Sequence, residues 1–225
     1  MTIKSAEMIL KSTFGYDNFR GRQLDIIEKI IAGKNVLTVM PTGAGKSLCF
    51  QIPALIMEGL TIVVSPLISL MKDQVDAAVD IGLRAAFMNS SLSIVDRRDV
   101  ETRLRGGELD LLYISPERFS IPEFASILGS IPKSFIAIDE AHCVSEWGHD
   151  FRPDYLNLAD TLAAFPDTPV SAFTATATHR VQDDIVKKLR LRSPMTVRAS
   201  FNRPNLSYKV IAKNKPDDQI LRYVL

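Results

Sequence analysis

The chain has 225 residues, of which 46% are hydrophobic and 24% are charged, and its formal net charge at pH 7 is +1. This composition is typical of a globular protein and argues against a disordered or fibrous chain. The small net charge confines any site for a polyanion to a local patch.

Short apolar runs of strand length alternate along the chain with amphipathic segments of helical periodicity. Repeated alternation of this kind predicts an α/β fold, in which a mostly parallel β-sheet has helices on both faces. Ligands of such sheets bind outside the carboxyl ends of the strands, so chemistry is expected just after each run. The predicted strands are residues 36–40, 60–65, 85–88, 109–115, 134–139 and 170–174, and the predicted helices include residues 67–79, 94–104 and 179–189.

The first predicted strand leads into the glycine-rich segment MPTGAGKS, residues 40–47, which opens a helix. Small residues let backbone N–H groups surround a phosphate chain, and the helix N-terminus adds positive potential. The segment matches a phosphate-binding P-loop except that Met40 replaces the usual first glycine. The alternative is a glycine-rich turn with a surface lysine. The P-loop interpretation places Lys46 on the β and γ phosphates and Ser47 on Mg²⁺, and assigns nucleotide contacts to Thr42, Gly43, Ala44, Gly45, Lys46 and Ser47.

The predicted strand 134–139 ends in two adjacent acids, Asp139 and Glu140. At a strand tip, Asp139 can hold Mg²⁺ while Glu140 orients or deprotonates the attacking water. Two acids of this kind, taken alone, are usually solvated surface. Because they follow a P-loop, we favour a catalytic site made of Lys46, Asp139 and Glu140.

Residues 139–142 (DEAH) resemble motif II of the superfamily 2 helicases, and residues 143–155 (CVSEWGHDFRPDY) resemble the aromatic-rich loop of the RecQ family of DNA helicases. The resemblance covers nearly the whole chain. It implies a RecA-like P-loop NTPase domain, the first motor domain of an ATP-dependent DNA helicase that unwinds DNA 3′ to 5′ in recombination and repair. Other segments resemble further family motifs in the same order: residues 15–23, 64–74, 113–118, 173–177 and 200–205.

The resemblance also implies an adenine site near the N-terminus. Tyr16 and Arg20 would sandwich the adenine of ATP, and Gln23 would hydrogen-bond its edge, so ATP would be preferred over GTP. A guanidinium stacked on a purine and an amide facing its edge are reasonable chemistry. The alternative is that Tyr16 and Arg20 simply cover a helix surface.

For the DNA side, the resemblance implies that Trp147 and Phe151 stack on unpaired bases and that Arg152 touches the DNA backbone or an acid of the ATP site. An aromatic pair is often buried core, but the glycine, proline and charged residues around these two suit an exposed loop. The implied partners are single-stranded and forked DNA, and the implied cofactors are ATP and Mg²⁺. The residues implied to couple hydrolysis to movement are His142, Thr174 and Thr176.

Turn signals at residues 193–194 and 202–205 suggest a domain boundary. We expect residues 1–199 to form the first RecA-like domain and residues 200–225 to begin a second one, truncated here. The second domain of the family supplies an arginine finger worth ~10³–10⁵ in rate. No matching arginine-rich motif occurs in the sequence, so we expect the chain to bind nucleotide without separating strands effectively. We also expect it to be a monomer.

Two other functions remain open: an RNA-remodelling helicase of the same superfamily, and a nucleotide- or DNA-binding module without turnover. Cys49 and Cys143 lie far apart in the sequence and form no C-x-x-C pair, which argues against a zinc site and favours a reducing compartment. No apolar run reaches the ~20 residues of a membrane span, and the N-terminus lacks a secretory pattern. We therefore expect a cytoplasmic protein, associated with the nucleoid if the source is bacterial or archaeal.

Overall fold

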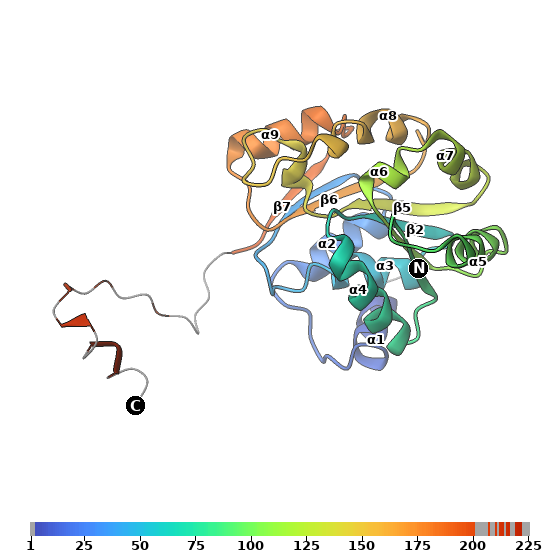
Figure 1. Cartoon of the computed structure of the whole chain (residues 1–225). Helices are drawn as coiled ribbons and strands as arrows, with labels where there is room; N and C mark the ends of the chain where they lie inside the picture. Colours follow the sequence, from blue (N-terminus) through green and yellow to red (C-terminus); the bar gives the residue numbers. More distant parts are fainter. Residues whose placement is uncertain are drawn as a thin grey trace.

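A central β-sheet with helices on both faces organises the molecule (Figure 1). The computed structural model describes residues 3–200 and, beyond them, residues 207, 210, 212, 213, 215, 216 and 219–221. Within these residues the sheet has seven strands in the order β3-β4-β2-β5-β6-β1-β7, and each neighbouring pair is parallel. The strands are β1 (Val36–Val39), β2 (Leu60–Val64), β3 (Ala85–Met88), β4 (Leu111–Ile114), β5 (Lys133–Ile138), β6 (Val170–Thr174) and β7 (Met195–Arg198).

The α/β class and the six predicted strands are confirmed, with ends that differ by a few residues at most. Strand β7 was not predicted. It pairs with β1 at the edge of the sheet, and only Val197 of its residues is buried, so it lacks the apolar run that marks the others. Most of residues 200–225 lie outside the described residues, so the expected division into two domains stays a prediction.

Helices α1 to α4 pack on one face of the sheet, and α5 to α9 pack on the other. The three predicted helices correspond to α4, α5 and α9. Thr178 explains where α9 begins, because its hydroxyl accepts a hydrogen bond from the Val181 N–H. The helices are α1 (Ile3–Ser12), α2 (Gln23–Ile31), α3 (Leu48–Ile56), α4 (Ile68–Asp80), α5 (Ile94–Arg105), α6 (Pro116–Phe119), α7 (Pro122–Gly129), α8 (Leu158–Ala163) and α9 (His179–Lys188), with 3₁₀ helices η1 (Ala141–Val144) and η2 (Pro153–Tyr155).

The sheet is buried on both faces because successive side chains of each strand enter opposite cores. In β2, Ile62 and Val64 join the core under α5 to α9, while Val63 joins the core under α1 to α4. In the second core, the rings of Phe50 and Phe173 meet edge to face with centroids 5.5 Å apart, which fixes α3 against β6. In the part of the chain that the structure describes, every helix is too short or too polar to cross a membrane.

Candidate nucleotide and nucleic-acid site

The loop of residues 40–47 connects β1 to α3, as the P-loop interpretation requires. Gly43 and Gly45 adopt φ values of +78° and +81°, a left-handed conformation that favours glycine. A Cβ at Gly45 would collide with the amide of Gln23, whereas a Cβ at Gly43 would meet nothing within 4 Å. Thr42 is exposed, and the Ser47 side chain forms no capping hydrogen bond within the described structure. The hydroxyl of Ser47 is therefore not committed to α3.

Gln23 lies under this loop and is tied to it. Its Nε2 donates to the main-chain oxygens of Ala44 at 3.0 Å and Gly45 at 3.3 Å, and its Oε1 accepts from the Arg20 N–H at 2.8 Å. Both ends of the amide are used within the protein, and the residue is buried. An adenine contact by Gln23 would have to replace some of these bonds, so that role stays a prediction.

Tyr16 and Arg20 lie beside the P-loop and contact each other, with the guanidinium carbon 5.8 Å from the ring centroid. Together with Gln23 and the loop glycines they line a small cavity of about 100 Å³. The structure thus brings the three predicted adenine residues to one place. Because Tyr16 and Arg20 already meet, sandwiching a base would require them to separate.

The acids at the end of β5 face the P-loop lysine. Lys46 Nζ lies 3.0 Å from Glu140 Oε1, and the other oxygen of Glu140 lies 3.3 Å from His142 Nδ1. The same His142 nitrogen lies 3.0 Å from the hydroxyl of Thr174, at the end of β6. Glu140 has a φ of +45°, a left-handed conformation that costs a non-glycine residue ~1–2 kcal/mol. Strain of this kind concentrates at functional sites.

The environments of the two acids push their pKa values apart. Burial raises the pKa of Asp139 to about 6, although the charge of Lys46 opposes the rise. Asp139 Oδ1 is buried and has no hydrogen-bond partner among the described residues. Burial also opposes ionisation of Glu140, but the hydrogen bond from His142 and the charge of Lys46 outweigh it and lower the pKa to about 2. Glu140 is therefore held ionised, whereas the pKa of Asp139 lies closer to neutral pH. Two neighbouring carboxyl groups with separated pKa values are typical of functional sites.

The segment that follows, residues 143–155, is termed the aromatic loop here. It folds back on the acids, because the Tyr155 hydroxyl donates to the main-chain oxygen of Asp139 at 3.0 Å. Trp147 is 59% exposed. The guanidinium of Arg152 donates to the main-chain oxygen of Pro66 at 3.2 Å and contacts Asp150 at 3.3 Å. An exposed tryptophan in a braced loop is compatible with the predicted contact to bases.

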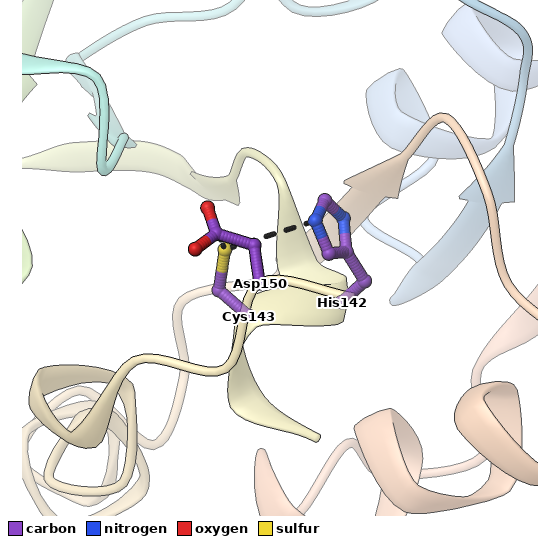
Figure 2. Close-up of side chains that lie close together, drawn as sticks. All are labelled: His142, Cys143 and Asp150. Carbon is purple, nitrogen blue, oxygen red and sulfur yellow. Dashed lines mark hydrogen bonds between the residues drawn. The ribbon is translucent and has the colours of Figure 1, made fainter. Parts of the chain in front are cut away.

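Figure 2 shows His142, Cys143 and Asp150 turned toward one another, and the Cys143 sulfur lies 3.9 Å from His142 Nε2 and 3.9 Å from Asp150 Oδ2. One ligand atom from each lies within 4.8 Å of the others, close enough to hold a metal ion. Two features speak against that use. Arg152 already pairs with Asp150, and burial, reinforced by the Asp150 charge, raises the pKa of the Cys143 thiol to about 12. The neutral thiol instead donates to Asp150 and braces the loop.

The residues predicted to couple hydrolysis to movement also lie together. Thr174 donates to the main-chain oxygen of Thr176 at 3.2 Å and contacts His142. The sequence reasoning missed His149, whose ring stacks on His142 at 4.1 Å and whose Nδ1 lies 3.4 Å from the Thr176 hydroxyl. Two of the chain's three histidines stand within eight residues of each other, but this closeness in sequence does not by itself show that their rings stack. Tyr155 was missed as well, since a tyrosine at the end of a loop carries no distinctive pattern.

A sequence profile of the DEAD/DEAH box helicases matches residues 20–185, most of the chain. The chain belongs to this family. Among DEAD/DEAH box relatives, it is 48% identical over 217 residues to the ATP-dependent DNA helicase RecQ of Pasteurella multocida and 48% identical over 224 residues to that of Bacillus subtilis. These alignments include 96% and 97% of this chain. The resemblance to RecQ helicases is thereby confirmed.

The chain spans about a third of the length of these two relatives, 34% and 37% respectively. A solved structure, that of a hypothetical ATP-dependent RNA helicase from Sulfolobus tokodaii, superposes with a TM-score of 0.66 at 23% identity, and the match covers 87% of this chain and 57% of that one. At this identity the likeness concerns the fold alone. It supports the predicted helicase-type α/β architecture.

Proposed function

We propose that this chain is the ATP-binding motor domain of a DNA helicase. The observation that carries the proposal is the 3.0 Å contact between Lys46 and Glu140, which joins the loop after β1 to the end of β5. A phosphate-binding lysine and a water-activating carboxylate must face the same phosphoryl group, and here they face each other. The RecQ relatives are named ATP-dependent DNA helicases, and these names support the proposal of an ATP-dependent enzyme that acts on DNA.

For nucleotide binding, we infer that the N–H groups of residues 42–47 surround the phosphates and that Lys46 exchanges Glu140 for the β and γ phosphates. Ser47 and Asp139 would hold Mg²⁺, and the fit rests on the buried Oδ1 of Asp139, which lacks a described partner. A bound Mg²⁺ supplies neutralisation of charge on the phosphates. Tyr16, Arg20 and Gln23 would then contact the adenine.

Glu140 would take the proton from the attacking water. In the resting site it is a weak base, because its pKa is about 2. When Lys46 turns to the phosphates, Glu140 loses that pairing and its pKa rises, while the hydrogen bond from His142 continues to lower it. ATP binding would therefore make Glu140 a stronger base for the attacking water, while His142 keeps the carboxylate oriented.

On the DNA side, we infer that Trp147 and Phe151 stack on unpaired bases, with Arg152 on the backbone, and that His142, Thr174 and Thr176 transmit hydrolysis to the loop. Unwinding 3′ to 5′ in recombination and repair would belong to the longer protein. There, residues 1–199 form the first RecA-like domain and residues 200–225 begin the second, which supplies an arginine finger. By itself the domain would bind ATP as a monomer and hydrolyse it slowly.

Titration with ATP and Mg²⁺ by calorimetry tests the nucleotide site. Lys46→Ala removes charge-assisted hydrogen bonds worth ~1.5–3 kcal/mol, so the affinity for ATP should fall ~10- to 100-fold. The surface variant Lys34→Ala serves as the control and should bind like the parent. Full ATP affinity in Lys46→Ala would overturn the assignment of the loop.

A second titration compares a single-stranded DNA with an RNA of the same sequence. Preference for RNA would favour the RNA-remodelling alternative. Binding of ATP and DNA without hydrolysis, even after the longer chain is assembled, would favour a module without turnover.

A further inference from the structure

One side of helix α9 is committed to the aromatic loop. Arg180, Asp184 and Lys188 follow one another at spacings of four residues, so their side chains lie in one row along the helix. From the sequence alone, such a row of charges is typical of a solvated face. In the structure all three side chains contact residues of the aromatic loop.

The first contact of the row has the shortest distance between a cation and an aromatic ring in the part of the chain that the structure describes. The guanidinium carbon of Arg180 lies 3.3 Å from the centroid of the Trp147 ring, well inside the ~6 Å range of a cation–π contact. The guanidinium therefore covers one face of the indole. Arg180 is itself exposed, so it holds the ring from the protein surface.

The other two contacts fix the loop on either side of Trp147. The Ser145 hydroxyl donates to Asp184 at 2.7 Å. Lys188 lies 3.2 Å from Glu146 and 5.7 Å from the ring centroid of Phe151. The backbone around Trp147 is thus anchored at several points, and Arg180 is the contact that orients the ring.

Trp147 nevertheless keeps 59% of its surface exposed. It also lines an open hollow of about 410 Å³ with Gly148, Thr176 and Val181. A ring that is covered by a cation and still widely exposed can accept a further planar group on its free surface. The usual planar partner in single-stranded nucleic acid is a base, which stacks on an aromatic side chain whatever its identity.

We propose that Arg180 is a positioning residue for DNA binding: it holds the Trp147 ring in the orientation that receives an unpaired base and stays in contact with the ring when the base is bound. This inference rests on the proposed function, since it names Trp147 as a base-stacking residue. The proposal predicts that removal of the Arg180 side chain weakens the binding of single-stranded DNA and leaves the affinity for ATP unchanged.

The contact between Arg180 and Trp147 can be tested without any DNA. Trp147 is the only tryptophan of the chain, so intrinsic fluorescence reports on this ring alone. In Arg180→Ala, acrylamide should quench the emission up to about twofold more efficiently, because one of the two ring faces is released. The quenching efficiency of Arg180→Lys should lie between those of Arg180→Ala and the parent, and the control Arg98→Ala on α5 should be quenched like the parent. Equal quenching in Arg180→Ala and the parent would refute the contact.

The role in binding is tested by titrating the same proteins with an oligothymidylate at several salt concentrations. Arg180→Ala should lower the affinity about two- to fivefold, the equivalent of one exposed cation–π contact, and Arg180→Lys should restore part of it. The slope of log affinity against log salt should not change. A slope reduced by about 1, with unchanged quenching, would show a direct phosphate contact instead and overturn the proposal.

Two further outcomes have distinct meanings. Tighter DNA binding by Arg180→Ala would mean that the arginine competes with bases for the ring, which refutes the positioning role. Failure of the parent chain itself to bind the oligothymidylate would count against the proposed function, and the quenching comparison would still decide whether Arg180 orients Trp147.

Discussion

In the absence of metal and nucleotide, the ionised carboxylate of Asp139 should lower the free energy of unfolding because it is buried. The substitution Asp139→Asn should remove this destabilisation. The carboxyl is buried, its Oδ1 has no partner among the described residues, and its pKa is raised from 3.8 to about 6. A group whose pKa is raised on folding contributes stability that is complete below its unfolded pKa and is lost as the pH rises through its folded pKa. A rise of this size corresponds to about 3 kcal/mol at most.

The asparagine variant resembles the protonated acid in shape and charge. We therefore expect Asp139→Asn to raise the free energy of unfolding by ~2–3 kcal/mol at pH 8, and to lose this advantage as the pH falls from about 6 to below 4. Urea denaturation in a chelating buffer, repeated across this pH range, measures the difference. The exposed carboxyl of Asp167 offers a matched control, because Asp167→Asn should leave stability nearly unchanged at each pH.

Addition of Mg²⁺ and ATP should reverse the order of stability, so that the parent becomes more stable than Asp139→Asn. The parent gains stability by binding, since a ligand that binds only the folded state stabilises it, whereas the variant has lost a proposed metal ligand and should gain less. If Asp139→Asn proves less stable than the parent at pH 8 in the chelating buffer, the interactions of the carboxylate with Lys46 and with the Glu140 backbone outweigh the cost of its burial, and the expected destabilisation is wrong.

Two smaller substitutions test the geometry around the site by urea denaturation. Gly45→Ala should cost at least ~1 kcal/mol more than Gly43→Ala, because both place a side chain in the left-handed region but only the Cβ at Gly45 strikes the amide of Gln23. Equal losses of stability in the two variants would mean that the Gln23 side chain moves aside without a measurable energetic penalty. Tyr155→Phe should cost about 1 kcal/mol, because the main-chain oxygen of Asp139 loses a buried hydroxyl donor. An unchanged stability would show that water replaces the hydroxyl.

The sequence predicted the sheet and the phosphate loop because both depend on local pattern. Apolar runs such as that of β2 bury both faces of a parallel strand, and the P-loop needs small residues at fixed spacing. Strand β7 escaped prediction because it lies at the edge, where three of its four residues are exposed. Its pairing with β1 is a long-range event that no local pattern encodes.

Contacts between distant segments were the harder part of the site. The ring stack of His142 and His149 could not be read from spacing, because it depends on how the aromatic loop turns after η1. The hydrogen-bond partners of Gln23 could not be predicted from the sequence either. A glutamine at the start of a helix can contact a ligand or the protein itself, and the oxygens of Ala44 and Gly45 come close to it only in the folded loop.

The aromatic loop and the acidic strand end behave as one closed unit, which bears on how DNA contact would reach the hydrolysis site. The aromatic loop follows Asp139 and Glu140 in the chain and returns to Asp139 through the Tyr155 hydroxyl. Midway, the N–H of Arg152 donates to the oxygen of Cys143 at 2.9 Å, and its guanidinium reaches Pro66 after β2. Trp147 lies in the segment between Cys143 and Arg152, so a base stacked on its ring would bind to a loop whose hydrogen bonds end on Asp139. The proposed base contact and the proposed metal ligand thus belong to one hydrogen-bonded segment, and this proximity is the structural basis on which coupling between them can be tested.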